Sequence, residues 1–123
     1  MPLSAFYVRA LQSGSKNLTL EVTGVLIEDG NHLTIEFGPD WIKPDQIVKV
    51  ASLVWLIEEK AGIRLWWDDE KLLAPLESRS AVRFDSGMRQ PDGWKRRIKL
   101  EAFNVLASNP SPKHFLLVMD FDK

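Results

Sequence analysis

The chain has 123 residues, of which 45% are hydrophobic and 27% charged. This balance is typical of one folded domain with its own core and excludes a disordered segment. Sixteen Lys and Arg residues against 17 Asp and Glu residues give a net charge of −1, so no global field attracts nucleic acid or an anionic membrane. The chain has no cysteine, which excludes disulfides and thiolate chemistry, and no apolar run long enough to cross a membrane.

The first third of the chain predicts three strands. Residues 5–11 form the first, and turn-forming residues follow at 13–17. Apolar and polar side chains then alternate through residues 18–27, the period of a half-buried strand. An Asp-Gly pair at 29–30 favours a tight turn, and residues 32–37 return with the same alternation. We therefore expect the second and third strands to pair as a hairpin.

The next stretch is ambiguous between strand and helix. Residues 38–45 contain two prolines, and we expect them to form a loop that crosses from one sheet to another. Within residues 46–59, several apolar positions fit a helical face. Many of them are β-branched, and residues 53–57 resemble a strand that is buried on both faces. We favour a strand, and a short helix within 44–60 stays open.

Two adjacent tryptophans lie in the following strand. Residues 58–62 predict a hairpin loop, and residues 63–67 form the returning strand. Successive side chains of a strand point to opposite faces, so Trp66 and Trp67 are expected on different sides of the sheet. One ring enters the core, and the other becomes a candidate for subunit contact. The acids at 68–70 are expected in a solvated turn.

The rest of the chain completes an all-β pattern. Further strands are predicted at residues 71–76, 80–84, 97–103 and 114–121, and two prolines within 109–112 break the last pair. About eight to nine short strands with frequent turns indicate a single β domain over residues 1–123. We expect an antiparallel β-sandwich or a jelly-roll-like barrel.

One short motif resembles a catalytic site. Asp85, Ser86 and Gly87 match the Asp-Ser-Gly of dimeric aspartic proteases, in which one carboxylate from each subunit shares a proton. Arg83 and Met88 depart from the apolar and small residues that this family prefers at the flanking positions. We interpret the motif as a turn, and a protease that uses Asp85 remains an alternative.

The other polar side chains predict no metal site. The acids at 68–70 are consecutive and point in different directions, whereas hard-metal loops space their carboxylates so that they converge. Asp120 and Asp122 share one face of the last strand, but no third partner is evident. His32 and His114 are isolated and form no zinc spacing. We therefore assign no catalytic residue, no metal and no cofactor.

A tryptophan precedes a basic segment at residues 94–99. An aromatic ring next to four cations is the local composition of a platform for single-stranded nucleic acid, which remains an alternative function. The net charge argues against a dedicated binder, so nucleic acid is not the expected partner. We favour a stripe that faces water, and an acidic protein partner is the second possibility. Alternation places Lys95, Arg97 and Lys99 on one face and Arg96, Ile98 and Leu100 on the other.

The second half of the chain resembles small virion structural proteins of tailed bacteriophages. The resemblance covers roughly the C-terminal 70 residues and departs from the pattern at 86–88, where a double glycine is usual, and at Trp94, where a glycine is usual. It rests on Leu53-Val54-Trp55, Ile63-Arg64-Leu65-Trp66-Trp67-Asp68, Leu76-Glu77-Ser78-Arg79-Ser80 with Phe84 and Gly87, Ile98-Lys99-Leu100, and residues 115–123.

This resemblance implies a non-enzymatic β-sandwich protein of the virion. A head decoration or cement protein is our first expectation, and a tail or head-to-tail component is the second. The implied partners are the major capsid protein or other virion proteins and further copies of this chain, for which a trimer is one arrangement. No membrane partner is expected, and without an export signal in residues 1–5 we expect synthesis in the host cytoplasm. The candidate contact residues are Trp41, Trp66, Trp67, Trp94, Lys95, Arg97 and Lys99.

Overall fold

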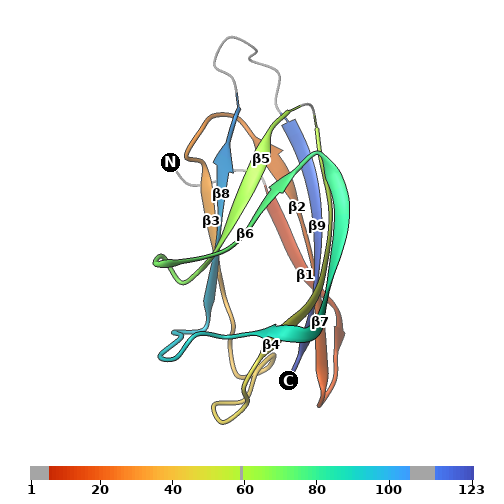
Figure 1. Cartoon of the computed structure of the whole chain (residues 1–123), viewed down its shortest axis with the longest axis vertical. Helices are drawn as coiled ribbons and strands as arrows, with labels where there is room; N and C mark the ends of the chain where they lie inside the picture. Colours follow the sequence, from red (N-terminus) through yellow and green to blue (C-terminus); the bar gives the residue numbers. More distant parts are fainter. Residues whose placement is uncertain (1–5, 59, 106–112) are drawn as a thin grey trace.

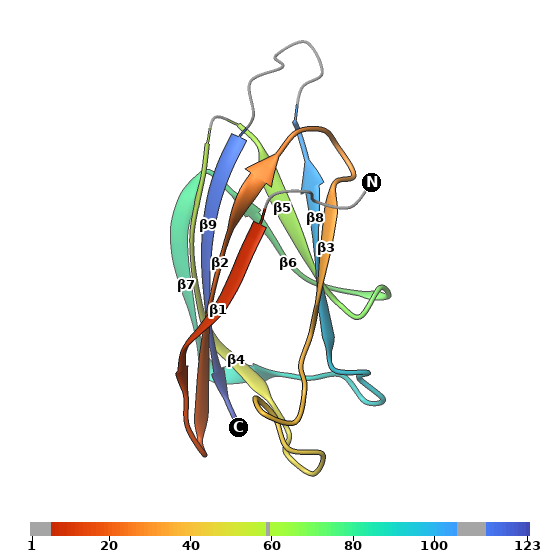
Figure 2. The same ribbon diagram turned by 180° about the vertical axis from the view of Figure 1, so that it is seen from behind.

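The computed structural model describes residues 6–58, 60–105 and 113–123, and these form two antiparallel β-sheets that face each other (Figures 1 and 2). One sheet has five strands in the order β1-β2-β9-β4-β7, and the other has four in the order β3-β8-β5-β6. The strands are β1 (Phe6–Ser13), β2 (Asn17–Leu26), β3 (His32–Glu36), β4 (Lys49–Ile57), β5 (Gly62–Trp67), β6 (Lys71–Glu77), β7 (Arg79–Arg89), β8 (Arg97–Phe103) and β9 (Lys113–Asp122).

The predicted fold class, an antiparallel all-β sandwich, is confirmed. Each stretch in which the sequence predicts a strand contains one, and strand β4 occupies most of the ambiguous segment. The short helix left open within 44–60 is absent from the described residues of that range. The described residues also include no helix long and apolar enough to span a membrane.

The core lies between the two sheets. The three inner strands of the five-stranded sheet, β2, β9 and β4, each send a buried apolar set inward, as in β2, where Leu18, Leu20 and Val22 are fully buried. Edge strand β7 contributes partly buried side chains such as Val82 and Phe84. The four-stranded sheet contributes Ile98 and Leu100 of β8 and the buried residues of the neighbouring strands β3 and β5. Burial of these alternating side chains supplies the main stabilisation of the sandwich.

The hairpin expected between residues 18–27 and 32–37 is wrong. Strand β2 pairs with β1 and β9, whereas β3 pairs with β8 in the other sheet. The connection is fixed by Asn31, whose side-chain oxygen accepts the backbone N–H groups of Ile27 and Glu28, both at 2.9 Å. Alternation fits two strands whose apolar sides face each other across a sandwich as well as two that lie side by side, so it could not separate these cases.

The hairpin expected around residues 58–62 is also wrong, for the same reason. Strand β4 lies in the five-stranded sheet and β5 in the four-stranded sheet, so the intervening loop crosses between layers. Two other loops behave as predicted. Residues 38–45 cross between the sheets, and the acids at 68–70 form the turn of a true β5–β6 hairpin.

Candidate functional site

The outer face of the four-stranded sheet gathers three of the seven predicted contact residues. Trp66 projects outward from β5, and its register partners are Lys99 on β8 and Leu72 on β6. Arg97 lies two residues before Lys99 and so projects from the same side. We call this surface the Trp66 face and define it by Thr34, Glu36, Arg64, Trp66, Leu72, Arg97, Lys99 and Glu101.

The Trp66 ring is half-buried at the centre of this face. Its indole Nε1 is shielded from solvent and has no hydrogen-bond partner among the described residues. The part of the side chain that reaches solvent is therefore ring carbon. The neighbouring Leu72 is 47% exposed, so the two side chains offer a small apolar surface.

Charges of both signs surround this apolar centre. Arg64 approaches Glu101 at 3.9 Å and stacks its guanidinium over the Phe103 ring, 4.4 Å from the centroid. Arg97 lies opposite Glu36 in the β3–β8 register. An aromatic centre with a polar rim is the usual anatomy of a protein–protein contact, where a few aromatic and arginine side chains supply most of the binding energy.

Trp67 and Trp94 are core residues, which corrects their prediction as contact residues. They are 3% and 7% exposed, and their rings meet edge to face with centroids 5.2 Å apart. Phe37 joins them by packing against Trp94 at 5.6 Å and against Phe121 at 5.3 Å. These buried rings fill one end of the sandwich and have no surface to offer a partner. The predicted division of Trp66 and Trp67 between opposite faces is correct.

The Trp41 side chain is partly buried, between the exposure of a surface residue and the burial of a core residue. It lies in the loop between β3 and β4, and its ring packs edge to face on Phe37 with centroids 5.9 Å apart. The Lys123 ammonium donates a hydrogen bond to the Trp41 carbonyl oxygen. Trp41 also lines a shallow surface depression with Glu36 and Gly38, so part of its ring stays available to a partner.

The basic stripe is shorter than predicted because β8 begins at Arg97. Lys95 lies in the preceding loop, where its backbone N–H donates to the Asp68 carboxylate at 3.0 and 3.2 Å. Arg96 adopts a positive φ of 63° and donates to the Pro44 carbonyl at 2.7 Å. The alternation expected through residues 95–100 therefore holds only from Arg97 onward.

The nucleic-acid alternative loses the aromatic residue on which it was based. The Trp94 ring is buried, and its Nε1 donates to the Arg97 carbonyl at 2.8 Å, so it cannot stack on a base. The Arg96 guanidinium holds a loop, and the Lys95 backbone is tied to Asp68. A stacking platform needs an exposed ring beside its cations, and residues 94–96 do not provide one.

The Asp-Ser-Gly motif lies in a bulge of strand β7. Arg83 pairs with Ser52 of β4 and Met88 pairs with Val50, so residues 84–87 stand opposite the single residue Ala51. Gly87 has a φ of 75°, and a Cβ there would lie 2.9 Å from the Lys49 Cβ. The glycine is thus required by backbone conformation and by space.

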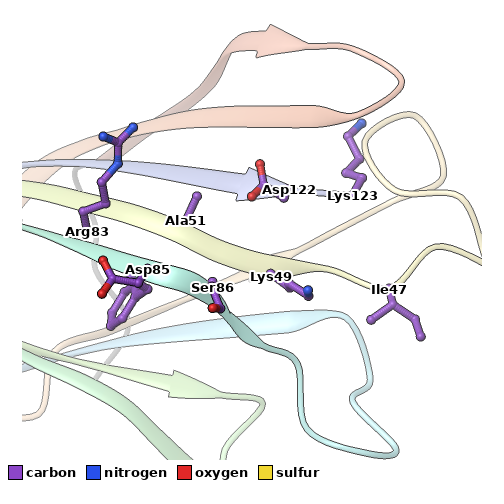
Figure 3. Close-up of a pocket in the computed structure, with 10 residues that line it drawn as sticks. Ile47, Lys49, Ala51, Arg83, Asp85, Ser86, Asp122 and Lys123 are labelled. Atoms are coloured by element: carbon purple, nitrogen blue, oxygen red, sulfur yellow. The ribbon is translucent and has the colours of Figure 1, made fainter.

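An open pocket of about 640 Å³ lies beside this bulge, on the outer side of the five-stranded sheet (Figure 3). Lys49, Arg83 and Lys123 contribute positive charge, while Asp85 and Asp122 contribute negative charge. A dimeric aspartic protease would need a second copy of Asp85 to approach closely enough to share a proton. The two cations Lys49 and Arg83 line the same space, and the described contacts of Asp85 give no support to that alternative.

The other polar candidates serve the fold. Both Asp120 oxygens are used, one by the Thr19 hydroxyl and the other by the Ser52 hydroxyl at 3.0 Å. Asp120 and Asp122 share the outer face, as predicted. Within residues 6–58, 60–105 and 113–123, no three His, Cys, Asp or Glu side chains converge as metal ligands would.

The sequence did not single out Arg64 and Leu72, which complete the Trp66 face. The outward position of Arg64 could have been predicted, because Arg64 lies two residues before Trp66 and a strand has a period of two. Leu72 was hidden by a bulge in the β5–β6 pair that shifts the register after Leu65. No signal in the sequence marks that bulge.

Comparison with known proteins gives no family. No protein-family model and no curated protein matches the chain. Among solved structures, a cupin domain from Bordetella pertussis Tohama I is similar over 100% of this chain and 98% of its own, with 11% identity and a TM-score of 0.46. An RmlC-like cupin protein from Desulfovibrio desulfuricans covers 93% and 81%, with 10% identity and a TM-score of 0.38. We draw no functional conclusion from similarities this weak.

Proposed function

We propose that this chain is a non-enzymatic structural protein of a bacteriophage particle. Its role is that of a head decoration or cement protein that binds the capsid lattice and neighbouring copies of itself. The phage assignment is based on the resemblance of the second half of the sequence to small virion proteins. The observation that supports a binding role is the Trp66 face, where an aromatic ring is surrounded by charges of both signs.

The Trp66 face is suited to a protein partner. A sheet surface with a tryptophan, an exposed leucine and a polar rim can be covered by another protein surface, and Arg64 already lies near Glu101. Lys99 and Arg97 flank the ring and would add attraction to an acidic surface on the lattice. The proposed partner is therefore the major capsid protein or another virion protein.

The test uses empty shells assembled from the capsid protein that the same genome encodes. We expect the purified chain to co-sediment with these shells at saturable stoichiometry. Trp66→Ala should weaken the binding by about tenfold or more, because central aromatic side chains dominate such contacts. Ile27→Ala, which removes an exposed apolar side chain from the loop between β2 and β3, is the control and should bind normally.

The outcomes separate the proposal from its alternatives. Failure to bind any shell, together with the absence of the chain from purified particles, would overturn the role in a virion. Electron microscopy of particles with and without the chain distinguishes head decoration from a tail or head-to-tail position. Equal binding by Trp66→Ala and the unaltered chain would remove the Trp66 face from the contact.

A further inference from the structure

The outer face of the five-stranded sheet carries an unusually apolar centre. Strand β9 is the central strand of this sheet, β4 lies beside it, and β7 is the edge strand beyond β4 (Figure 2). Val54 of β4 lies opposite both Val118 of β9 and Ala81 of β7, while Leu56 lies opposite Leu116. We call these five outward residues the aliphatic face. Val54 and Leu56 are 49% and 46% exposed.

Strands β4 and β9 are apolar on both sides over part of their length, around Val54 and Leu56 and around Leu116 and Val118. In β9 the buried Phe115, Leu117 and Met119 alternate with outward Leu116 and Val118. A sheet with one solvated side shows polar residues at its outward positions, whereas a continuous apolar run is typical of a strand covered on both sides. The chain covers only the inner side. The sequence of these stretches therefore favours a second cover for the aliphatic face.

The acids that border this face on β2 and β9 have hydrogen-bond partners within the chain, whereas Arg79 and Arg83 border it on β7, with Arg79 opposite Leu56. The Asp120 carboxylate accepts the hydroxyl groups of Thr19 and Ser52, and Glu21 accepts the Arg9 Nε at 3.0 Å. A buried carboxylate is costly only when it lacks partners. This side of the sheet can thus be covered by an apolar surface without leaving those acids unsatisfied.

We propose that the aliphatic face is the interface of a symmetric dimer, with a second copy of this chain as its occupant. This inference rests on one part of the proposed function, the binding of neighbouring copies, and identifies the surface that makes that contact. It does not depend on the presence of the chain in a phage particle. Strands of 8 to 11 residues at a spacing of about 4.8 Å give this side an area of about 700 Å². Specific interfaces take about 600–1,000 Å² from each partner, so the contact has to extend from the aliphatic face over most of this side of the sheet.

The position of the apolar residues favours a second copy over an unrelated protein. The aliphatic face spans β9, β4 and β7, and a two-fold axis through it lays the face on its own equivalent. Two sheets packed in this way extend each core by one more layer, as in other sandwiches. An unrelated partner would need a matching apolar sheet, whereas a second copy supplies one by symmetry.

The experiment measures the mass of the purified chain over a wide concentration range by sedimentation velocity. We expect a reversible dimer. Val54→Lys places a charge at the centre of the proposed interface and should raise the dimer dissociation constant about 100-fold or more. Leu72→Lys, at a leucine of matched exposure on the opposite sheet, is the control and should leave the dimer unchanged.

A second measurement does not require the fold to accept a lysine at position 54. Because the chain has no cysteine, Val54→Cys and Leu72→Cys each introduce a single thiol. A short bis-maleimide reagent should join two copies of the Val54→Cys chain and leave Leu72→Cys monomeric. A monomer at all concentrations, or a dimer that responds only to changes at Leu72, would overturn the inference. Dimerisation without shell binding would overturn only the particle role.

Discussion

Gly62 allows a direct test of how closely the four-stranded sheet is packed. The residue begins β5 and lies opposite Phe103 of β8. A Cβ built on Gly62 would lie 2.3, 2.5 and 2.8 Å from three atoms of the Phe103 ring. The φ of Gly62 is not positive, so an alanine meets no conformational penalty there. Any loss of stability in Gly62→Ala would therefore come from contact with the ring.

The size of this loss follows from what the ring must do. It has to move by about 1 Å to restore ordinary contact, and overpacking of this kind costs about 1–3 kcal/mol. The movement also disturbs the stacking of Arg64 on Phe103, an interaction of about 0.5–1 kcal/mol. We expect Gly62→Ala to lower the free energy of unfolding by about 2–3 kcal/mol, equivalent to roughly 10 °C in Tm for a chain of this size.

Urea unfolding followed by tryptophan fluorescence measures the loss directly. Gly38→Ala is the control, because its Cβ would meet no atom within 4 Å, and it should remain within about 0.5 kcal/mol of the unaltered chain. The double variant Gly62→Ala with Phe103→Leu should lose less than the sum of the two single changes. Equal stability of the Gly62 and Gly38 variants, or strict additivity in the double variant, would refute the steric argument.

Three further changes test the core, the crossing loop and the bulge. Trp67→Ala should cost about 3–5 kcal/mol in urea unfolding and Trp66→Ala clearly less, because only Trp67 lies in the core; a reversed order would contradict the assignment. Asn31→Ala leaves two backbone N–H groups without their acceptor and should lower stability by about 1–3 kcal/mol, whereas an unchanged midpoint would show that the loop does not need them. Gly87→Ala should cost about 1–2 kcal/mol by calorimetry, since φ is 75° and Lys49 is close, and a neutral result would argue against the bulge.

The strands with the clearest signal were predictable because each has one solvated and one buried side. Alternation in residues 18–27 and 32–37 predicts two strands, and β2 and β3 lie there. Their partners were not predictable, since the pattern specifies which side chains are buried but not which sheet buries them. The Asp-Gly pair suggested a tight turn, yet Asn31 uses its side chain to direct the chain to the opposite layer.

The tryptophans illustrate the same limit at the candidate site. Trp66 and Trp67 could be divided between opposite faces by the strand period alone. Trp94 lies outside any strand, so no period applied to it, and its neighbouring cations suggested a surface position. Its burial depends on Trp67 and Phe37, which approach it from other strands or loops. Contacts between residues so distant in sequence have no local signal.

The apolar run at residues 53–57 is the strongest sequence signal for assembly, because a single copy of the chain buries only one side of it. Residues 53–57 resemble a strand buried on both sides, and in the structure Val54 and Leu56 of that strand face outward. The opposite sheet differs, because its outward centre is one half-buried ring among charges. An aliphatic surface is typical of a permanent interface between identical copies, whereas a polar surface with one central aromatic ring is typical of an interface with a separate partner. If both proposals hold, Val54→Lys should produce monomers that still bind shells through Trp66. Their binding should be weaker, because a monomer offers one Trp66 face to the shell and a dimer offers two.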